Sequence, residues 1–307
     1  MQTRPLGSGG PELTVVGFGA WEAGKPSDWG TPPPDEQILE AIRAALDHGI
    51  GWIDTAEVYG DGTSERFVAR AVGERRDEVL IASKVAPRPE GSGFRPEQVA
   101  AACRGTLERL GTDRLDLYQL HWPDEDDGVP IEETWGAMVE LVGAGLVRWI
   151  GVSNFDRPMI ERCSAIRHVD SLQQEFSMLA LADRELIRWC GEQGIGVVTY
   201  APLGYGLLTG AITMDTTFAP GDFRPGEDMF APDALRRALA VVDGLRPIAD
   251  RLGATVAQLA LAWNFHQPGV TSAIAGSRDP RHVAANAAAG DLVLDAPTLD
   301  AVDALLA

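Results

Sequence analysis

The feature that most constrains the fold is a regular alternation along the whole chain. Short runs rich in β-branched and other apolar residues occur eight times, and stretches with apolar residues at three- and four-residue intervals lie between them. This alternation predicts a parallel sheet whose strands are linked by helices. Eight such units in 307 residues predict an α/β fold of the (β/α)8 barrel type, formed as a single domain over residues 1–307.

The boundaries of these elements follow from the periodicity and from start and stop signals. Pro96, Pro130 and Pro280 lie near helix starts, where the missing N–H does no harm, and Gly49 ends the first helix. The predicted strands are Val15–Gly19, Gly51–Asp54, Val79–Lys84, Leu115–Gln119, Arg148–Val152, Ser171–Gln174, Gly196–Tyr200 and Thr271–Ala275. The predicted helices are Asp35–Gly49, Thr63–Gly73, Pro96–Leu110, Pro130–Gly143, Asp156–Ala165, Asp183–Gln193, Asp233–Arg251, Thr255–His266 and Pro280–Ala289.

Two segments fall outside the alternation. Residues 3–16 carry GSGG between two short β-like runs and predict a β-hairpin ahead of the first barrel strand. Residues 204–231 are rich in Gly, Pro, Asp and Phe and predict a long loop. Long loops inside compact domains usually have a function, so we expect this one to form part of a binding site.

Charge and cysteine content exclude several classes of protein. The formal net charge of -19 disfavours nucleic acid and anionic membranes as partners. A polyanionic cofactor would therefore need local arginines or helix N-termini. The cysteines, Cys103, Cys163 and Cys190, are too few and too far apart for a disulfide framework or a CxxC metal site, so we expect them to be buried or half-buried apolar residues.

The chain also lacks sequence signals for membranes or export. No apolar run approaches the roughly 20 residues that a membrane helix needs. The first residues, MQTRPLGSGG, have no apolar core typical of a signal peptide. We therefore expect a cytoplasmic protein with no membrane partner.

Titratable side chains follow three consecutive predicted strands. Asp54 ends the second strand and is followed by Tyr59, Lys84 ends the third, and His121 comes just after the fourth. Each alone has an ordinary interpretation, as a helix cap, a packed ring, a rim charge or a structural histidine. Active sites of such barrels lie at the C-terminal ends of the strands, so together these residues predict a catalytic cluster at one rim.

The same residues carry a resemblance to a known family. The segments GWIDTAEVYGDGTSE, VLIASKV, LDLYQLHWPD, IGVSNF, YAPLGYGLLTG and AIAGSRDPRHVAANAAA occur in this order between about residues 3 and 290. In them the chain resembles the aldo-keto reductases, and TYAPLGYG is most similar to the bacterial-type members. The resemblance implies NADPH-dependent reduction of aldehydes and ketones to alcohols, on a small-molecule carbonyl substrate.

The resemblance also implies a role for each of the four residues. Tyr59 would donate the proton to the carbonyl oxygen as hydride arrives at the carbon. We expect the Lys84 ammonium to lower the pKa of Tyr59, whose reference value is about 10. Asp54 would hold Lys84 in place, and His121 would orient the substrate carbonyl.

Further residues are implied to bind the cofactor. Polar groups after two strands match the nicotinamide carboxamide, Tyr200 matches the ring that stacks on it, a Gly-rich stretch matches the pyrophosphate path, and Arg278 matches the 2′-phosphate site, favouring NADPH over NADH. The loop around residues 222–230 resembles the segment that folds over the cofactor. The full set is Ser153, Asn154, Gln174, Tyr200, Ala201, Leu203, Gly204, Gly206, Leu208, Gly276, Ser277, Arg278, His282 and Asn286.

The substrate pocket and two alternatives stay open. Trp21, Trp29 and Trp122 follow strand ends and are candidates for the pocket wall. The family also includes slow, NADPH-binding subunits of potassium channels, so a sensing role is the main alternative. A metal-dependent hydrolase or isomerase using Asp54, Glu57 and Glu175 is a third reading; we expect no metal, because a lysine beside a tyrosine is a poor metal site. We expect a monomer, with an oligomer as the alternative.

Overall fold

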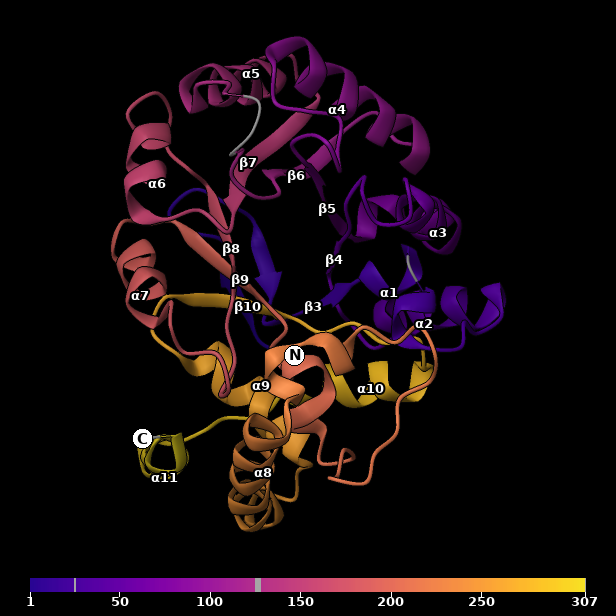
Figure 1. Cartoon of the computed structure of the whole chain (residues 1–307). Coiled ribbons are helices and arrows are strands. Elements are labelled where there is room, and N and C mark those ends of the chain that lie inside the picture. The colour runs from indigo at the N-terminus through magenta and orange to yellow at the C-terminus, as the bar shows by residue number, and fades with distance from the viewer. Residues whose placement is uncertain (25, 125–127, 307) are drawn as a thin grey trace.

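The predicted barrel is present in a computed structural model, which describes residues 1–24, 26–124 and 128–306. Within these residues, eight parallel strands close into a barrel in the order β10-β3-β4-β5-β6-β7-β8-β9, ringed by helices (Figure 1). Each strand lies within one residue of its predicted bounds at either end. The barrel strands are β3 Val16–Gly19, β4 Trp52–Asp54, β5 Leu80–Val85, β6 Leu115–Leu120, β7 Val147–Ser153, β8 Ser171–Glu175, β9 Gly196–Tyr200 and β10 Val270–Ile274.

The predicted hairpin closes the N-terminal end of the barrel. Its strands, β1 Thr3–Pro5 and β2 Glu12–Thr14, pair antiparallel with Arg4 opposite Leu13. Leu6 and Leu13 are at most 3% exposed and join the apolar cluster inside the barrel. The hairpin therefore acts as a plug that leaves the opposite end as the open one.

The helices surround the barrel in the predicted order, with additions. The α-helices are α1 Trp21–Gly24, α2 Asp35–Asp47, α3 Thr63–Val72, α4 Pro96–Leu110, α5 Ile131–Gly143, α6 Arg157–Ser164, α7 Arg184–Glu192, α8 Pro232–Leu252, α9 Val256–His266, α10 Pro280–Ala289 and α11 Ala296–Leu306. The 3-10 helices are η1 Pro26–Trp29, η2 Gly73–Glu78, η3 Gly204–Thr209, η4 Arg224–Gly226 and η5 Asp228–Phe230. Most strand–helix packing is apolar and forms one continuous core cluster.

Two expectations were incomplete. Helix α11 was not predicted, although Asp295 accepts a bond from the backbone N–H of Thr298 at 3.0 Å, which is a helix-start signal. The segment 204–231 was predicted as a loop, but it contains three short 3-10 helices. Single turns of 3-10 helix need little periodicity, so the sequence gives no signal for them.

Strand alternation divides the barrel interior into two layers. Trp52, Ala82 and Leu117 point inward and form an apolar lower layer with the hairpin. Two residues further along each strand come Asp54, Lys84 and Gln119, which face the same way because side chains alternate with a period of two. The polar residues therefore lie together at the C-terminal end.

The long segment after β9 reaches across this open end. Figure 1 shows it in orange, passing from the barrel centre towards α1 and α2 before it returns to α8. The backbone N–H of Phe223 donates to the carbonyl of Asp28 at 2.9 Å. Trp21, Trp29, Tyr205 and Phe223, here called the aromatic cluster, have ring centroids 5.0–6.5 Å apart. The segment is thus fastened to the loop after β3. No helix in the described part of the chain is long and apolar enough to cross a membrane.

Candidate active site

The four predicted catalytic residues converge at the C-terminal end of the barrel. The Nζ of Lys84 lies 2.5 Å from Oδ1 of Asp54, 3.3 Å from the hydroxyl of Tyr59 and 3.0 Å from the carbonyl of Thr55. The Tyr59 hydroxyl lies 3.5 Å from Nε2 of His121. Lys84 is fully buried and Asp54 is 3% exposed. Consecutive parallel strands carry three of these side chains to one rim.

Two buried glutamines, neither predicted from the sequence as a site residue, extend this network. The amide of Gln173 donates to Oδ2 of Asp54 at 2.9 Å and to Oε1 of Gln119 at 3.2 Å. Asp54 therefore accepts one bond from a cation and one from a neutral amide. The signal was present in the adjacent pair 173–174, but alternation alone does not say which glutamine faces inward.

Strand register settles that question. Gln173 pairs with Ser153 and faces the barrel interior, whereas Gln174 donates to Asp183 at 2.8 Å on the outer side. The structure does not bring Gln174 to the four catalytic candidates. Gln173 is the glutamine beside them.

Burial determines the protonation of Tyr59. The sequence led us to expect that Lys84 lowers the pKa of Tyr59. Instead, burial and then the Asp54 carboxylate hold the pKa of Tyr59 well above its ordinary value. Asp54 neutralises the Lys84 ammonium at 2.5 Å, so little net positive charge acts on the phenol. Tyr59 consequently keeps its proton at neutral pH, as a proton donor must.

His121 is neutral and its orientation suggests a tautomer. Burial, and then the positive charge of Lys84, hold the pKa of His121 well below its usual range. Its Nδ1 is buried without a hydrogen-bond partner in the described residues, while Nε2 faces Tyr59. An N–H left unpaired in the interior is costly, so the proton is favoured on Nε2. His121 can then donate a hydrogen bond towards the open end.

Three predicted cofactor residues lie at the neighbouring strand ends. Ser153 ends β7 and is 1% exposed, and Asn154 follows it with a φ of 61°. The Asn154 amide donates to the His121 carbonyl at 3.0 Å and accepts from the Tyr200 hydroxyl at 2.9 Å. Hydroxyl and amide groups at this rim can both donate and accept, as a nicotinamide carboxamide requires.

The stretch after β9 has an unusual backbone. Ala201, Gly204, Tyr205 and Gly206 all have positive φ values, between 50° and 100°. Successive turns of this kind form concavities lined by backbone N–H groups, which suit phosphate oxygens. Leu208 is fully buried in the core, and Leu203 is packed against it, so their side chains are structural. These residues fit a dinucleotide through the backbone alone.

The predicted 2′-phosphate region lies between β10 and α10. Gly276 approaches the backbone of Gly19 so closely that a Cβ would lie 2.3 Å from its carbonyl oxygen. Ser277 lies 3.5 Å from Nδ1 of His282, and Asn286 is buried on α10. Arg278 donates to the carbonyls of Trp29 at 2.9 Å and Thr31 at 3.3 Å. Arg278 is therefore anchored to the segment after β3.

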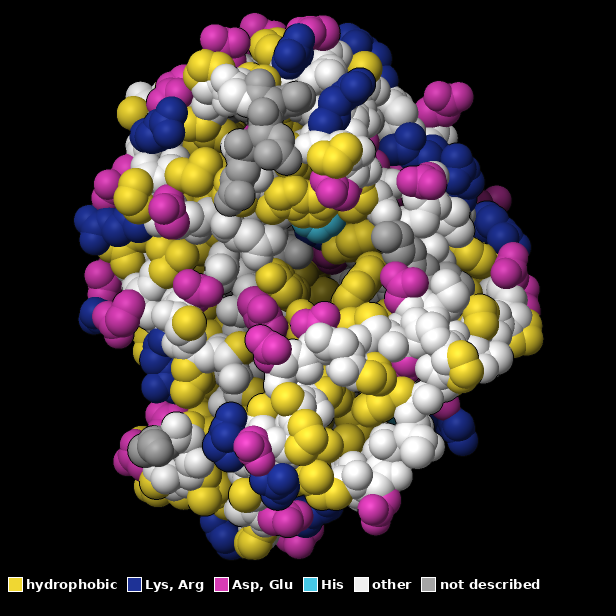
Figure 2. Space-filling view, viewed as in Figure 1, with side chains coloured by type: hydrophobic (Ala, Val, Ile, Leu, Met, Phe, Trp, Pro, Cys, Tyr) yellow, Lys and Arg dark blue, Asp and Glu magenta, His cyan; other side chains and the backbone are white. Residues whose placement is uncertain are grey.

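The three candidate tryptophans occupy two different places. The Trp122 ring lies 4.5 Å from the His121 ring, beside the catalytic candidates. Trp21 and Trp29 belong to the aromatic cluster and pack on each other and on Phe223. Figure 2 shows a hollow at the centre of this face, walled mainly by hydrophobic side chains with acidic ones around it.

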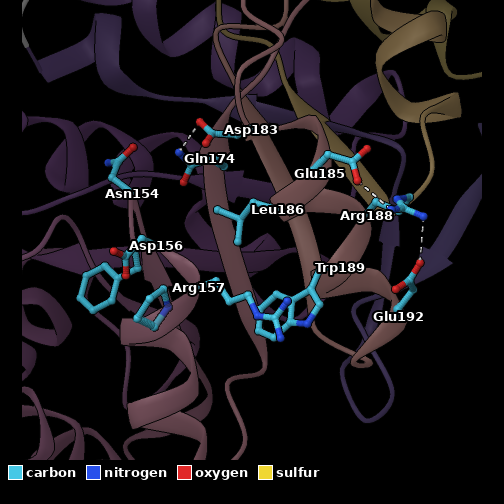
Figure 3. A pocket seen from close by; sticks show the side chains of 12 residues that line it. Asn154, Asp156, Arg157, Gln174, Asp183, Glu185, Leu186, Arg188, Trp189 and Glu192 are labelled. Carbon is cyan, nitrogen blue, oxygen red and sulfur yellow. Dashed lines mark hydrogen bonds and ion pairs between the residues drawn. The ribbon is translucent and has the colours of Figure 1, made fainter.

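A separate cavity lies outside the barrel rim. It measures about 720 Å³ and is lined by residues of α6 and α7 and the ends of β7 and β8. Figure 3 shows Asn154, Gln174 and Asp183 at one end, and Arg157 beside Trp189 at the other. The Arg157 guanidinium stacks on the Trp189 ring at 4.7 Å. None of the four catalytic candidates lines this cavity, so it is distinct from their site.

Carboxylates, histidines and cysteines are the other groups that could carry chemistry. No group of three or more His, Cys, Asp or Glu residues is arranged for a metal ion in the described residues. Burial raises the pKa of Cys103, Cys163 and Cys190 to about 12, which makes them inert. Glu57 accepts bonds from the backbone N–H groups of Ala86 and Ser92 and thus holds the loop after β5.

Comparison with known proteins gives a consistent result over nearly the full chain. A family model described as "Aldo/keto reductase family" matches residues 15–307. An aldo-keto reductase of Bacillus subtilis is 36% identical over 91% of this chain and 86% of its own length. An NADH-specific methylglyoxal reductase of Escherichia coli is 31% identical, covering 94% and 93%. A probable voltage-gated potassium channel subunit beta of Arabidopsis thaliana is 31% identical, covering 95% and 92%.

Solved structures agree. A glycerol dehydrogenase of Gluconobacter oxydans superposes with a TM-score of 0.88 at 30% identity, covering 99% of this chain and 94% of that one. An aldo/keto reductase of Klebsiella pneumoniae, in complex with NADP and acetate, superposes with a TM-score of 0.73 at 32% identity, covering 96% and 92%.

Proposed function

This chain belongs to the aldo/keto reductase family, and from that premise we propose that it reduces aldehydes and ketones with NADPH, with Tyr59 as the general acid. One observation carries the proposal. The Tyr59 hydroxyl stands between the Nζ of Lys84 at 3.3 Å and Nε2 of His121 at 3.5 Å, at the open end of the barrel. A carbonyl oxygen that contacts both Tyr59 and His121 meets two hydrogen-bond donors.

The protein groups have separate tasks. A reduced nicotinamide, when bound, supplies the hydride. Tyr59 holds the proton that the carbonyl oxygen takes up, because burial keeps the phenol protonated. The product alkoxide is far more basic than a phenolate, so this transfer is downhill even with a raised pKa. Lys84 then stabilises the phenolate by donating a hydrogen bond to its oxygen, Asp54 fixes the position of Lys84, and Gln173 holds Asp54.

Neutral His121 serves positioning rather than proton supply. Its lowered pKa leaves no second positive charge beside Lys84. With its proton on Nε2, it donates to the carbonyl oxygen from the side opposite Lys84 and so polarises the carbonyl. Trp122, whose ring lies 4.5 Å from that of His121 in a tilted arrangement, is the tryptophan best placed to shape the substrate pocket.

The cofactor set consists of rim side chains and loop backbone. Ser153, Asn154 and Gln173 would hold the carboxamide, the ring of Tyr200 would face the nicotinamide, and the stretch from Ala201 to Gly206 would follow the pyrophosphate. Arg278 supports the choice of NADPH, because a guanidinium is suited to the 2′-phosphate. We also propose that the chain works as a cytoplasmic monomer on small carbonyl compounds.

A direct assay tests the function. Purified protein is mixed with NADPH and a panel including 4-nitrobenzaldehyde and methylglyoxal, and the loss of reduced-nicotinamide absorbance is followed. We expect turnover of at least one aldehyde. A protein that bound no reduced nicotinamide at all would contradict the proposal.

The channel-subunit relative motivates a second candidate. Its 31% identity over 95% of this chain allows a slow, NADPH-binding regulatory role. The same assay separates the two: tight NADPH binding without turnover on any carbonyl favours the regulatory role.

A further inference from the structure

A half-buried charge cluster surrounds Arg278 and contacts Trp29 of the aromatic cluster. Oε2 of Glu22, on α1, lies 3.3 Å from Nε of Arg278, and the two side chains are 19% and 22% exposed. Nearby, Arg224 binds Asp222 through two of its nitrogens, at 2.9 and 2.6 Å. Glu22 interacts electrostatically with Arg224 as well as with Arg278. An acidic side chain thus faces the residue best suited to bind an anionic phosphate.

Arg278 is held in this position from several sides. Besides Glu22, it donates to the backbone carbonyls of Trp29 and Thr31, and its own carbonyl accepts from the Gln37 amide at 2.9 Å. These contacts join the loop after β10 to α1, η1 and α2. They fix the guanidinium beside the Glu22 carboxylate. Any ligand that binds Arg278 is therefore also exposed to the negative charge of Glu22.

We propose that Glu22 determines how strongly the protein prefers NADPH over NADH. The proposal rests on the function proposed above, and it concerns the end of the cofactor where the two nucleotides differ. The Glu22 carboxylate offsets the positive charge of Arg278 and repels the dianionic 2′-phosphate. NADH, which has a 2′-hydroxyl there, does not experience this repulsion.

The effect also operates through Glu22 itself. Burial raises the pKa of Glu22, while Arg278 and Arg224 oppose that rise, so the carboxylate depends on its two cations. A phosphate that took over Arg278 would leave Glu22 with less compensation in a half-buried place. Both effects disfavour the phosphate. Glu22 therefore limits the discrimination that Arg278 alone would give.

The test measures nucleotide binding rather than turnover. Dissociation constants for NADPH and NADH are obtained from quenching of tryptophan fluorescence, for the wild type and for Glu22→Gln. The amide keeps the shape but removes the charge. We expect NADPH to bind on the order of tenfold more tightly, since one charge acting across a half-buried site is worth more than an exposed ion pair and less than a fully buried one. NADH should change by less than about twofold.

Matched variants isolate the charge effect. Glu12→Gln removes the same charge from an exposed position on β2, at the plugged end of the barrel, and should leave the ratio of the two constants unchanged. In the Arg278→Ala background, Glu22→Gln should shift the ratio much less. Glu22→Asp keeps the charge but moves it one methylene further from Arg278, so the ratio of the two constants should shift less, in the same direction. This variant replaces Glu22→Gln in the test if the amide variant does not fold.

Each outcome has a distinct meaning. An unchanged ratio in folded Glu22→Gln and Glu22→Asp overturns the role of Glu22 while leaving the proposed function intact. If the wild type binds neither NADPH nor NADH, the proposed function is overturned instead. A shift of the ratio that persists fully without Arg278 also contradicts the proposal, because it places the effect elsewhere.

Discussion

Two buried carboxylates at opposite ends of the barrel show how one kind of contact serves two purposes. Asp54 ends β4 at the open end and accepts from Lys84 and Gln173. Asp116 lies near the start of β6 at the other end and accepts from Arg76 at 2.8 Å, Arg148 at 3.0 Å and the backbone N–H of Ile81 at 2.9 Å. Both carboxylates are 2–3% exposed.

The difference lies in the cation. Arg76, one of the two cations at Asp116, also donates to the backbone carbonyls of Val79 and Arg114 and so ties neighbouring strands together. Lys84 instead contacts the hydroxyl of Tyr59, which faces the open end. The ion pairs of Asp116, at the plugged end of the barrel, should therefore contribute to stability. The ion pair of Asp54, at the open end, should contribute to the rate of reaction.

The largest expected effect is at the open end. Tyr59→Phe removes the proton donor, and we expect kcat for carbonyl reduction to fall by about 10²–10⁴-fold. Binding of NADPH and the free energy of unfolding should change little, because the ring still fills its place. Steady-state kinetics and nucleotide titration measure both effects. Tyr118→Phe, which removes the hydroxyl of a fully buried tyrosine outside the four catalytic candidates, is the control and should retain kcat. Full activity of Tyr59→Phe would exclude the proton-donor role.

At the plugged end the effect should appear in stability. Asp116→Asn removes the charge that Arg76 and Arg148 share, and Arg76 is only 18% exposed. We expect the free energy of unfolding to fall by about 2–3 kcal/mol, with kcat unchanged in the folded protein. Urea unfolding and kinetics on the same preparation check this. A loss of kcat without a loss of stability would contradict the division between the two ends.

The same contrast explains what the sequence could and could not predict. Strand periodicity placed Asp54, Lys84 and His121 at one rim, because position along the chain determines which end of a parallel strand a residue occupies. It did not choose between Gln173 and Gln174, since the two alternate sides and only the register with Ser153 decides. It also gave the wrong direction for the pKa of Tyr59, since burial of the phenol, the largest cause of the raised pKa, depends on tertiary packing.

Contacts between segments far apart in sequence were also beyond prediction. The hydrogen bond from Arg278 to the carbonyl of Trp29 joins two residues that are 249 positions apart in the sequence. Nothing local in either segment indicates that they meet. The hairpin and the barrel were predictable because each rests on neighbouring elements, whereas the aromatic cluster and the Glu22–Arg278 pair arise only from closure of the barrel.

A smaller effect should distinguish the two ends through pH. Burial lowers the pKa of His121, so below about pH 6.5 the unfolded chain binds a proton there that the folded protein resists. Stability should therefore fall on acidification from that pH, by at most about 1.4 kcal/mol per pH unit from this group. Urea unfolding of the wild type and His121→Asn between neutral and mildly acidic pH tests this. If the free energy of unfolding falls equally with acidification in both proteins, His121 is not the cause of the loss of stability.

The smallest expected effect concerns Asp116, whose carboxylate has several hydrogen-bond and ion-pair partners. Arg148 is 46% exposed, and Asp116 keeps Arg76 and the Ile81 N–H when Arg148 is removed. We expect Arg148→Ala to lower the free energy of unfolding by about 0.2–1 kcal/mol, because Arg148 is half exposed and Asp116 keeps its other partners, and to leave kcat unchanged. Asp54 has no second cation in the described residues, so Lys84→Met should abolish turnover instead. A loss of activity in Arg148→Ala comparable to that in Lys84→Met would mean that the bottom of the barrel controls the geometry of the top.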